Sequence, residues 1–176
     1  AGGGIRHTGR AADTGMIRPA RDAAAAAIAA IWNPIIRDTV VTFTPVEKSE
    51  ADIVEVLAAR KSAGQPFLVA EAEGEVLGFA TYFQFRSGPG YARTMEHSVN
   101  LSPHARGRGL GRALMQMLER EARAQGVHVL IGAISAMNTD SLRFHETLGF
   151  AEGGRLQAVG WKFGRFHDLV LMQKQL

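Results

Sequence analysis

The 176-residue sequence contains no cysteine. It therefore cannot form a disulfide framework, a thiolate metal site or an acyl-cysteine intermediate. Long apolar runs are also missing, because no run approaches the roughly 18 residues that a membrane span needs. The Ala-rich stretch 23–30 is too short, and no signal-peptide pattern precedes it. These absences indicate a cytoplasmic protein with no membrane segment.

A strong excess of one charge is missing too. The sequence has 20 Lys and Arg against 17 Asp and Glu, a net charge of +3. Basic proteins often bind nucleic acid, but here the basic residues are scattered and no recognised nucleic-acid motif accompanies them. The exception is the cluster Arg106, Arg108 and Arg112, which fits a small polyanionic ligand. No His, Asp and Glu cluster has metal-ligand spacing, so we expect no metal and no nucleic-acid partner.

Helical and strand-like patterns alternate along most of the chain. Residues 1–15 are Gly-rich without periodicity, and we expect them to be disordered or an expression remnant. Residues 16–176 then form a single domain of α/β (α+β) class with a mixed sheet. The patterns predict helices at 19–32, 49–63, 111–125 and 138–148, and strands at 16–18, 67–70, 76–86, 94–101, 127–134, 150–159 and 161–173. Pro34 is expected just beyond the first helix, and the β-rich stretch 39–43 lies between two helices.

The most informative stretch runs from a strand through a Gly-rich loop into an amphipathic helix. In strand 94–101, Glu96 is the charged residue on the face opposite Met95 and His97. The loop reads Arg106-Gly107-Arg108-Gly109-Leu110-Gly111 and continues into Arg112. Glycines allow close backbone approach, and a helix N-terminus attracts anions, so the stretch can hold phosphate. It matches neither Walker A nor the dinucleotide fingerprint, and a simple Gly-rich connection is the alternative.

The Arg-x-x-Gly-x-Gly loop resembles the pyrophosphate loop of the GNAT N-acetyltransferase superfamily, which binds acetyl-CoA. A second marker follows, in which Asn138 opens a helix that ends at Gly149-Phe150. The stretches YARTMEHSV, RFHETLGF and GWKFGRFHD, with IWN and FLVA near the front, resemble the phosphinothricin and methionine sulfoximine acetyltransferase branch. The resemblance covers residue 16 to the C-terminus. It implies a GNAT fold with a mixed, mostly antiparallel central sheet flanked by helices, and a homodimer.

The resemblance also implies the site residues. Cofactor-binding residues are Val99, Asn100, Leu101, Arg106, Gly107, Arg108, Gly109, Leu110, Gly111, Arg112 and Asn138. Among them, Val99 N–H is the implied oxyanion donor. Asn100 stands where the branch usually has an aromatic residue, so a contact there is backbone-only or altered.

Two side chains are candidates for proton transfer. Glu96 is either the general base, acting directly or through water, or a solvent-facing strand carboxylate. His145 falls where many GNAT proteins carry a Tyr that protonates the departing thiolate, but a lone helix His is often structural. The substrate-binding candidates are Arg86, Tyr91, Glu96 and Phe43. Arg86 suits bidentate capture of a carboxylate or phosphinate, although a strand end can also carry an exposed Arg.

The resemblance implies a direct reaction in a ternary complex. The acetyl group of acetyl-CoA passes to the α-amine of a small amino-acid analogue of the phosphinothricin, methionine sulfoximine or methionine sulfone type. One alternative is the same chemistry on an aminoglycoside, a polyamine or a protein N-terminus. Another is a non-catalytic acyl-CoA-binding module.

Overall fold

The computed structural model describes residues 15–176. The predicted disordered or expression-derived segment 1–15 therefore lies, apart from its last residue, outside the described residues. The strands are β1 Met16–Pro19, β2 Phe67–Ala72, β3 Glu75–Gln84, β4 Thr94–Leu101, β5 Val129–Ser135, β6 Ala151–Lys162 and β7 Arg165–Gln175. The α-helices are α1 Ala25–Asp38, α2 Glu50–Ser62, α3 Leu110–Ala124 and α4 Thr139–Thr147.

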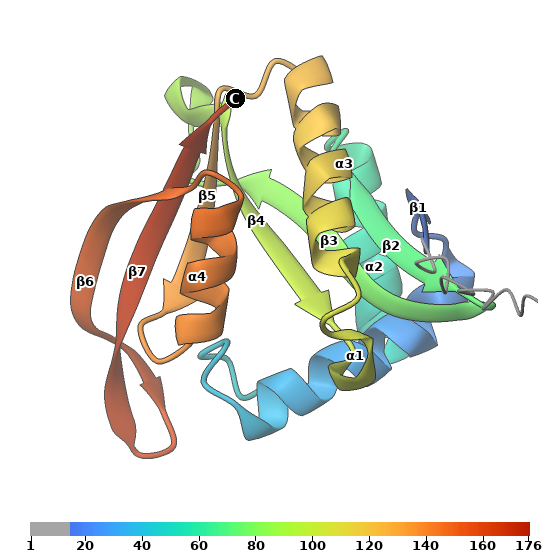
Figure 1. The fold of residues 1–176 in the computed structure, drawn as a ribbon, viewed down its shortest axis with the longest axis horizontal. Coiled ribbons are helices and arrows are strands. Elements are labelled where there is room, and N and C mark those ends of the chain that lie inside the picture. The colour runs from blue at the N-terminus through green and yellow to red at the C-terminus, as the bar shows by residue number, and fades with distance from the viewer. Residues whose placement is uncertain (1–14) are drawn as a thin grey trace, which may run out of the picture.

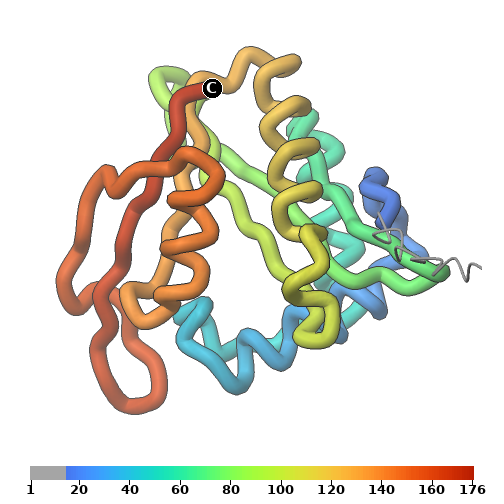
Figure 2. The backbone as a smooth tube through the Cα atoms, viewed as in Figure 1, coloured from blue at the N-terminus to red at the C-terminus, as the bar shows by residue number. Residues whose placement is uncertain are grey.

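The strands form one seven-stranded sheet in the order β1-β2-β3-β4-β5-β7-β6. Every neighbouring pair is antiparallel except β4 and β5, which run parallel. Figures 1 and 2 show helices on both sides of this twisted sheet. The predicted mixed, mostly antiparallel sheet flanked by helices is confirmed.

Alternating residues of the central strands supply two separate cores. In β2, Phe67 and Val69 pack with the α1 and α2 side chains, whereas Leu68 and Ala70 pack with those of α3. Side chains of consecutive strand residues point to opposite faces, so a strand buried on both faces reads as a continuous apolar run. The sheet is therefore covered by α1 and α2 on one face and by α3 on the other.

Strands β4 and β5 pair only over part of their length. Thr94–His97 pairs with Val129–Gly132, and beyond this stretch the two strands diverge (Figure 1). Meanwhile β4 stays paired with β3 as far as Leu101. The divergence opens the sheet at the carboxyl end of β4, where the Gly-rich loop begins.

The first helix differs from its prediction. Helix α1 begins at Ala25 after a 3-10 turn at Asp22–Ala24, and it continues through Pro34 to Asp38. The prediction that Pro34 lies beyond the helix was wrong. Proline removes one helical hydrogen bond, but the turn that follows it is secured by tertiary contacts, with Ile36 fully buried. The β-rich stretch 39–43 that comes next forms no strand; it is an irregular loop.

The C-terminal hairpin turns later than predicted. The break was expected at Gly160, yet β6 runs on to Lys162 and the turn is formed by Phe163 and Gly164, both with positive φ (53° and 71°). Two residues with positive φ give a type I′ turn, whose twist matches that of a hairpin.

The other boundaries agree closely with the patterns. Strand β4 has the predicted bounds, and α2 has the predicted N-cap, in which Ser49 and Asp52 form a reciprocal capping box. Within residues 15–176, no helix is both long and apolar enough to cross a membrane. The same residues contain no group of three His, Asp or Glu side chains that could hold a metal ion.

Candidate functional site

A cavity of about 370 Å³ lies where β4 and β5 diverge. Its walls come from the end of α1, the loop after it, β4, β5 and the start of α4. Its lining includes Trp32, Phe43, Glu96, Asn100, Asn138 and His145. The site therefore joins segments that are more than 100 residues apart in the sequence.

Glu96 brings a carboxylate to this cavity. It projects from β4 on the face of α1 and α2, where its sheet neighbour on β3 is Phe83. Burial raises its pKa above the ordinary value of 4.5, because desolvation disfavours the charged form. The residue is half-buried and lines the cavity rather than standing fully exposed on the strand. A carboxylate with a raised pKa is better suited to accept a proton near neutral pH.

On the opposite face of β4, His97 meets His145 of α4. Their Nε2 atoms lie 2.8 Å apart, and both rings are buried. Nδ1 of His145 lies 2.7 Å from the Ser141 carbonyl oxygen. A carbonyl oxygen only accepts, so this Nδ1 carries a hydrogen. In a neutral His145 the Nε2 then carries no hydrogen, so it accepts a hydrogen bond from Nε2–H of His97.

This arrangement keeps both rings neutral. Burial and the neighbouring ring lower the pKa of His97 to about 3, and burial also lowers the pKa of His145. Nδ1 of His97 has no hydrogen-bond partner among the described residues. Gly132 of β5 makes room for the pair, since a side-chain carbon there would lie 3.2 Å from a nitrogen of His145.

The backbone of β4 presents open peptide groups at the divergence. Thr94 O accepts from Phe85 N, and Ser102 N donates to Leu77 O, both on the β3 side. Peptide groups of successive residues in a strand point to opposite sides. Val99 and Leu101 therefore direct their N–H and C=O groups toward β5, in the stretch where β5 has turned away.

The Gly-rich loop continues from this open edge into α3. Gly107 and Gly109 have φ of 75° and 78°, a conformation that suits glycine, and Gly109 is the N-cap of α3. The first amides of the 15-residue helix, from Leu110 to Arg112, have no partner within the helix. Gly111 is buried where α3 approaches Phe144 of α4. A side-chain carbon added at Gly111 would lie 3.3 Å from the Phe144 ring. This open edge and helix N-terminus fit a pantetheine arm leading to a pyrophosphate.

Asn138 and Asn100 both line the cavity. The side-chain oxygen of Asn138 accepts from Ser141 N at 3.2 Å and so caps α4. The capping bond uses the oxygen and leaves the amide NH₂ of Asn138 as the group that can donate to a ligand.

The structure separates the substrate-binding candidates. Phe43 and Glu96 line the cavity, but Arg86 and Tyr91 do not. Arg86 is exposed just after β3, and its guanidinium lies 5.7 Å from the centre of the Tyr91 ring. Sequence reasoning missed His97, whose signal was its place on the apolar face of β4. It also missed Trp32, the last residue of the predicted first helix, and Ile35, which lies beyond the predicted end of that helix.

Comparison with known proteins agrees with this geometry. The model of the acetyltransferase (GNAT) family matches residues 32–150. The L-amino acid N-acyltransferase MnaT of Escherichia coli is 41% identical over 91% of this chain and 93% of its own length. An L-methionine sulfoximine/L-methionine sulfone acetyltransferase of Pseudomonas paraeruginosa is 42% identical over 91% and 94%.

A solved structure adds the co-substrate. The GNAT superfamily phosphinothricin acetyltransferase of Sinorhizobium meliloti, in complex with acetyl-CoA, superposes with a TM-score of 0.88 at 34% identity, covering 93% of this chain and 89% of its own. The chain belongs to the GNAT acetyltransferase family, and it is an acetyl-CoA-dependent N-acetyltransferase.

Proposed function

We propose that this enzyme transfers the acetyl group to the α-amine of a small amino-acid analogue of the phosphinothricin, methionine sulfoximine or methionine sulfone type. The relatives that carry these names match more than 90% of the chain. The observation that carries the proposal is the half-buried Glu96 carboxylate in a cavity bordered by the open backbone of Val99. The cavity is small, which favours a small acceptor over a polymer such as nucleic acid.

In the proposed reaction, acetyl-CoA supplies an acetyl thioester. Glu96, directly or through a water molecule, takes one proton from the acceptor ammonium, whose reference pKa is about 7.7–8.0. The free amine forms the new C–N bond as the C–S bond breaks. The acylated nitrogen then loses its second proton, and the departing thiolate takes up a proton. Val99 N–H stabilises the negative charge that develops on the carbonyl oxygen. Asn100, Leu101 and Asn138 hold the pantetheine arm, and residues 106–112 hold the pyrophosphate.

His145 is our candidate for returning the proton to sulfur. Both of its ring nitrogens are engaged, one by Ser141 and the other by His97. A proton-transfer role therefore requires that its Nε2 release His97 when substrates bind, take up the second proton that the amine loses and pass it to the thiolate. Otherwise His145 shapes the cavity as a neutral ring.

Arg86 and Tyr91 are proposed to bind the acceptor's acidic group. Their support is the resemblance and the chemistry of Arg, which pairs with carboxylates and phosphinates in bidentate fashion. If this role is right, Arg86→Ala raises the acceptor KM and leaves the acetyl-CoA KM unchanged.

We further propose a cytoplasmic homodimer in which residues 16–176 act as one domain. One sheet built from β1 to β7 supports the single domain. The aromatic side chains Trp161, Phe163 and Phe166 of the C-terminal hairpin are each more than half exposed and support a second copy covering them. We favour the cytoplasm because the enzyme needs acetyl-CoA as its co-substrate.

The test is CoA release with acetyl-CoA and five amines: phosphinothricin, methionine sulfoximine, methionine sulfone, an aminoglycoside and spermidine. We expect turnover with the first three only. Turnover confined to the two cationic amines would keep the acetyltransferase and overturn the substrate. Tight acetyl-CoA binding with no turnover on any amine would favour the acyl-CoA-binding module over this substrate class.

A further inference from the structure

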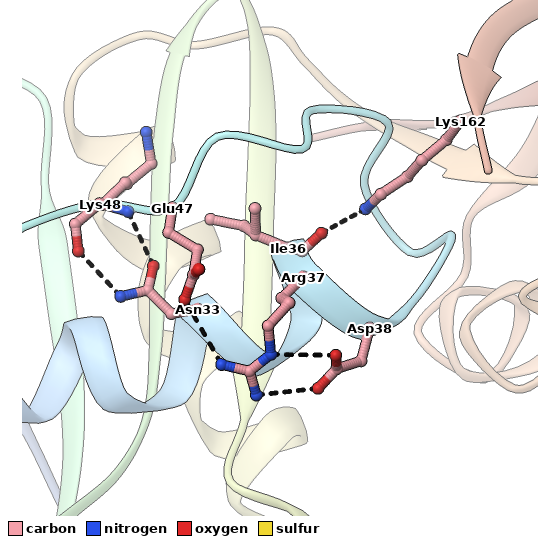
Figure 3. A network of polar contacts seen from close by, with 7 residues as sticks. All are labelled: Asn33, Ile36, Arg37, Asp38, Glu47, Lys48 and Lys162. Atoms are coloured by element: carbon pink, nitrogen blue, oxygen red, sulfur yellow. Dashed lines mark hydrogen bonds and ion pairs between the residues drawn. The ribbon is translucent and has the colours of Figure 1, made fainter. Parts of the chain in front are cut away.

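Lys162, the last residue of β6, carries a buried ammonium group that the proposed reaction does not use. The residue is 4% exposed. Nζ donates to the carbonyl oxygens of Ile36 at 2.5 Å, Thr39 at 2.6 Å and Thr42 at 2.8 Å. Figure 3 shows the side chain reaching from the hairpin to the end of α1. An ammonium has three donors, and here each finds a backbone acceptor.

These carbonyl groups belong to the last turn of α1 and to the segment 39–48 that follows it, which we call the acceptor loop. The base of the loop is closed on α1. Asn33 donates to Lys48 O and accepts from Lys48 N, both at 2.8 Å, and Arg37 bridges to Glu47 (Figure 3). Lys162 holds the other end of the loop, more than 100 residues away in sequence.

The part of the loop that Lys162 holds is also a wall of the cavity. Thr42 lines the cavity beside Phe43. The Phe43 ring lies directly on Gly160, where a side-chain carbon would overlap it, and stacks on His167 with 5.7 Å between ring centres. The hairpin therefore fixes the wall by a charge at one point and by ring contacts at another.

A buried cation on neutral carbonyl groups needs a physical reason. Burial lowers the pKa of the Lys162 ammonium, and the nearby Asp38 carboxylate opposes that change. The end of a helix carries partial negative charge, which favours a cation there. An apolar side chain of the same length would fill the space, but it would leave three carbonyl groups without their donors. The ammonium therefore does more than fill space, because its three hydrogen bonds fix the position of the loop.

We propose that Lys162 is the positioning residue of the acceptor site: its ammonium docks the acceptor loop on the β6–β7 hairpin and so sets the position of Thr42 and Phe43 against the acceptor. This inference rests on the proposed function for the identity of the acceptor. It predicts that loss of the ammonium weakens acceptor binding and leaves the proposed acetyl-CoA site, at β4 and the N-terminus of α3, intact.

The test compares Lys162→Met with Lys174→Met. Lys174 of β7 is a matched control, because it too donates to a helix-end carbonyl, that of Leu148 at 2.6 Å, and to Glu119. We expect Lys162→Met to raise the acceptor KM about tenfold, since small misplacements in a site have effects of that size or more, with the acetyl-CoA KM unchanged. Lys174→Met is expected to lower the melting temperature without changing either KM.

The absence of cysteine allows a rescue. Lys162→Cys can be aminoethylated in denaturant and refolded, which rebuilds a lysine-like ammonium at this single position. Restored acceptor KM supports the proposal. An unchanged acceptor KM in folded Lys162→Met, or equal increases in both KM values, overturns it.

Hydrogen exchange separates this inference from the proposed function. Backbone amides of residues 36–43 should exchange faster in Lys162→Met than in wild type or Lys174→Met, whichever amine proves to be the acceptor. If exchange there is unchanged, the docking role is wrong even when the proposed substrates are turned over. Faster exchange together with turnover on other amines would keep the docking role and reject the substrate class.

Discussion

At the scale of single residues, Glu96 is the proposed general base. Because burial raises its pKa, the carboxylate becomes active as a base at higher pH than an ordinary carboxyl. Glu96→Gln keeps the shape and removes the base, so we expect kcat to fall about 10²- to 10⁴-fold, with acetyl-CoA affinity unchanged. In wild type, kcat should rise with pH through the titration of Glu96.

The measurement is a pH profile of kcat at saturating acceptor for both proteins. The rise should be missing from Glu96→Gln, whose remaining pH dependence belongs to the acceptor amine. A profile of the same shape in both proteins would show that Glu96 is not the base.

The His97–His145 pair makes a second residue-scale prediction. The folded pKa of His97 is about 3, below its ordinary 6.5. Between pH 6.5 and 3 the unfolded chain therefore binds a proton at His97 that the folded chain does not bind. The contribution of a neutral His97 to the free energy of unfolding is complete above pH 6.5 and is lost as pH falls toward 3. We expect wild type to lose about 1.4 kcal/mol of unfolding free energy per pH unit more than His97→Asn in that window.

Urea unfolding at several pH values between 7.5 and 4.5 measures this difference. Above pH 6.5 the gap between the two proteins should stay constant. Parallel curves below pH 6.5 would mean that His97 is protonated in the folded protein.

At the scale of elements, the two ends of α3 offer a matched comparison. Gly109 at its N-cap and Gly126 just beyond its C-terminal end have φ of 78° and 77°, and both have open space for a methyl group. Alanine at either position costs about 1–2 kcal/mol of stability, because the left-handed conformation is strained. Only Gly109→Ala is expected to weaken acetyl-CoA binding, by about tenfold, since the amides at that end are the proposed pyrophosphate donors.

Calorimetric titration with acetyl-CoA distinguishes the two variants, and thermal unfolding measures their shared loss. Equal acetyl-CoA affinities in Gly109→Ala and Gly126→Ala would show that the glycine loop does not bind the cofactor.

At the scale of the whole molecule, the C-terminal hairpin exposes aromatic residues that a second copy would cover. Trp161 and Phe166 are 58% and 63% exposed, and their rings pack edge to face with centres 4.7 Å apart. We expect light scattering to give twice the 19.0 kDa chain mass for wild type. Glu substitution at both positions should give a folded monomer. Val46 is an exposed residue in the acceptor loop, and the control variant Val46→Glu should stay dimeric. A wild-type monomer at all concentrations contradicts the proposal.

Local patterns were sufficient for much of this protein. The alternation in β4, the capping box at Ser49 and the glycines before α3 are consequences of backbone geometry within a few residues. They predicted the mixed sheet and the glycine loop before α3, because those features need little information from distant segments. Motif resemblance then supplied the family, the co-substrate and the choice of Glu96, which the structure places in the cavity.

The tertiary structure decided what depends on distant contacts. Pro34 stays inside α1 because the turn after it is buried and bound by Lys162, 126 residues beyond Ile36. The pairing of His97 with His145 depends on how β4 packs against α4, which no local pattern encodes. The exposed placement of Arg86 likewise follows from where β3 ends. Sequence alone determined the chemistry available to this chain, and the packing of distant segments determined which groups meet, since contact across the fold is absent from any short stretch.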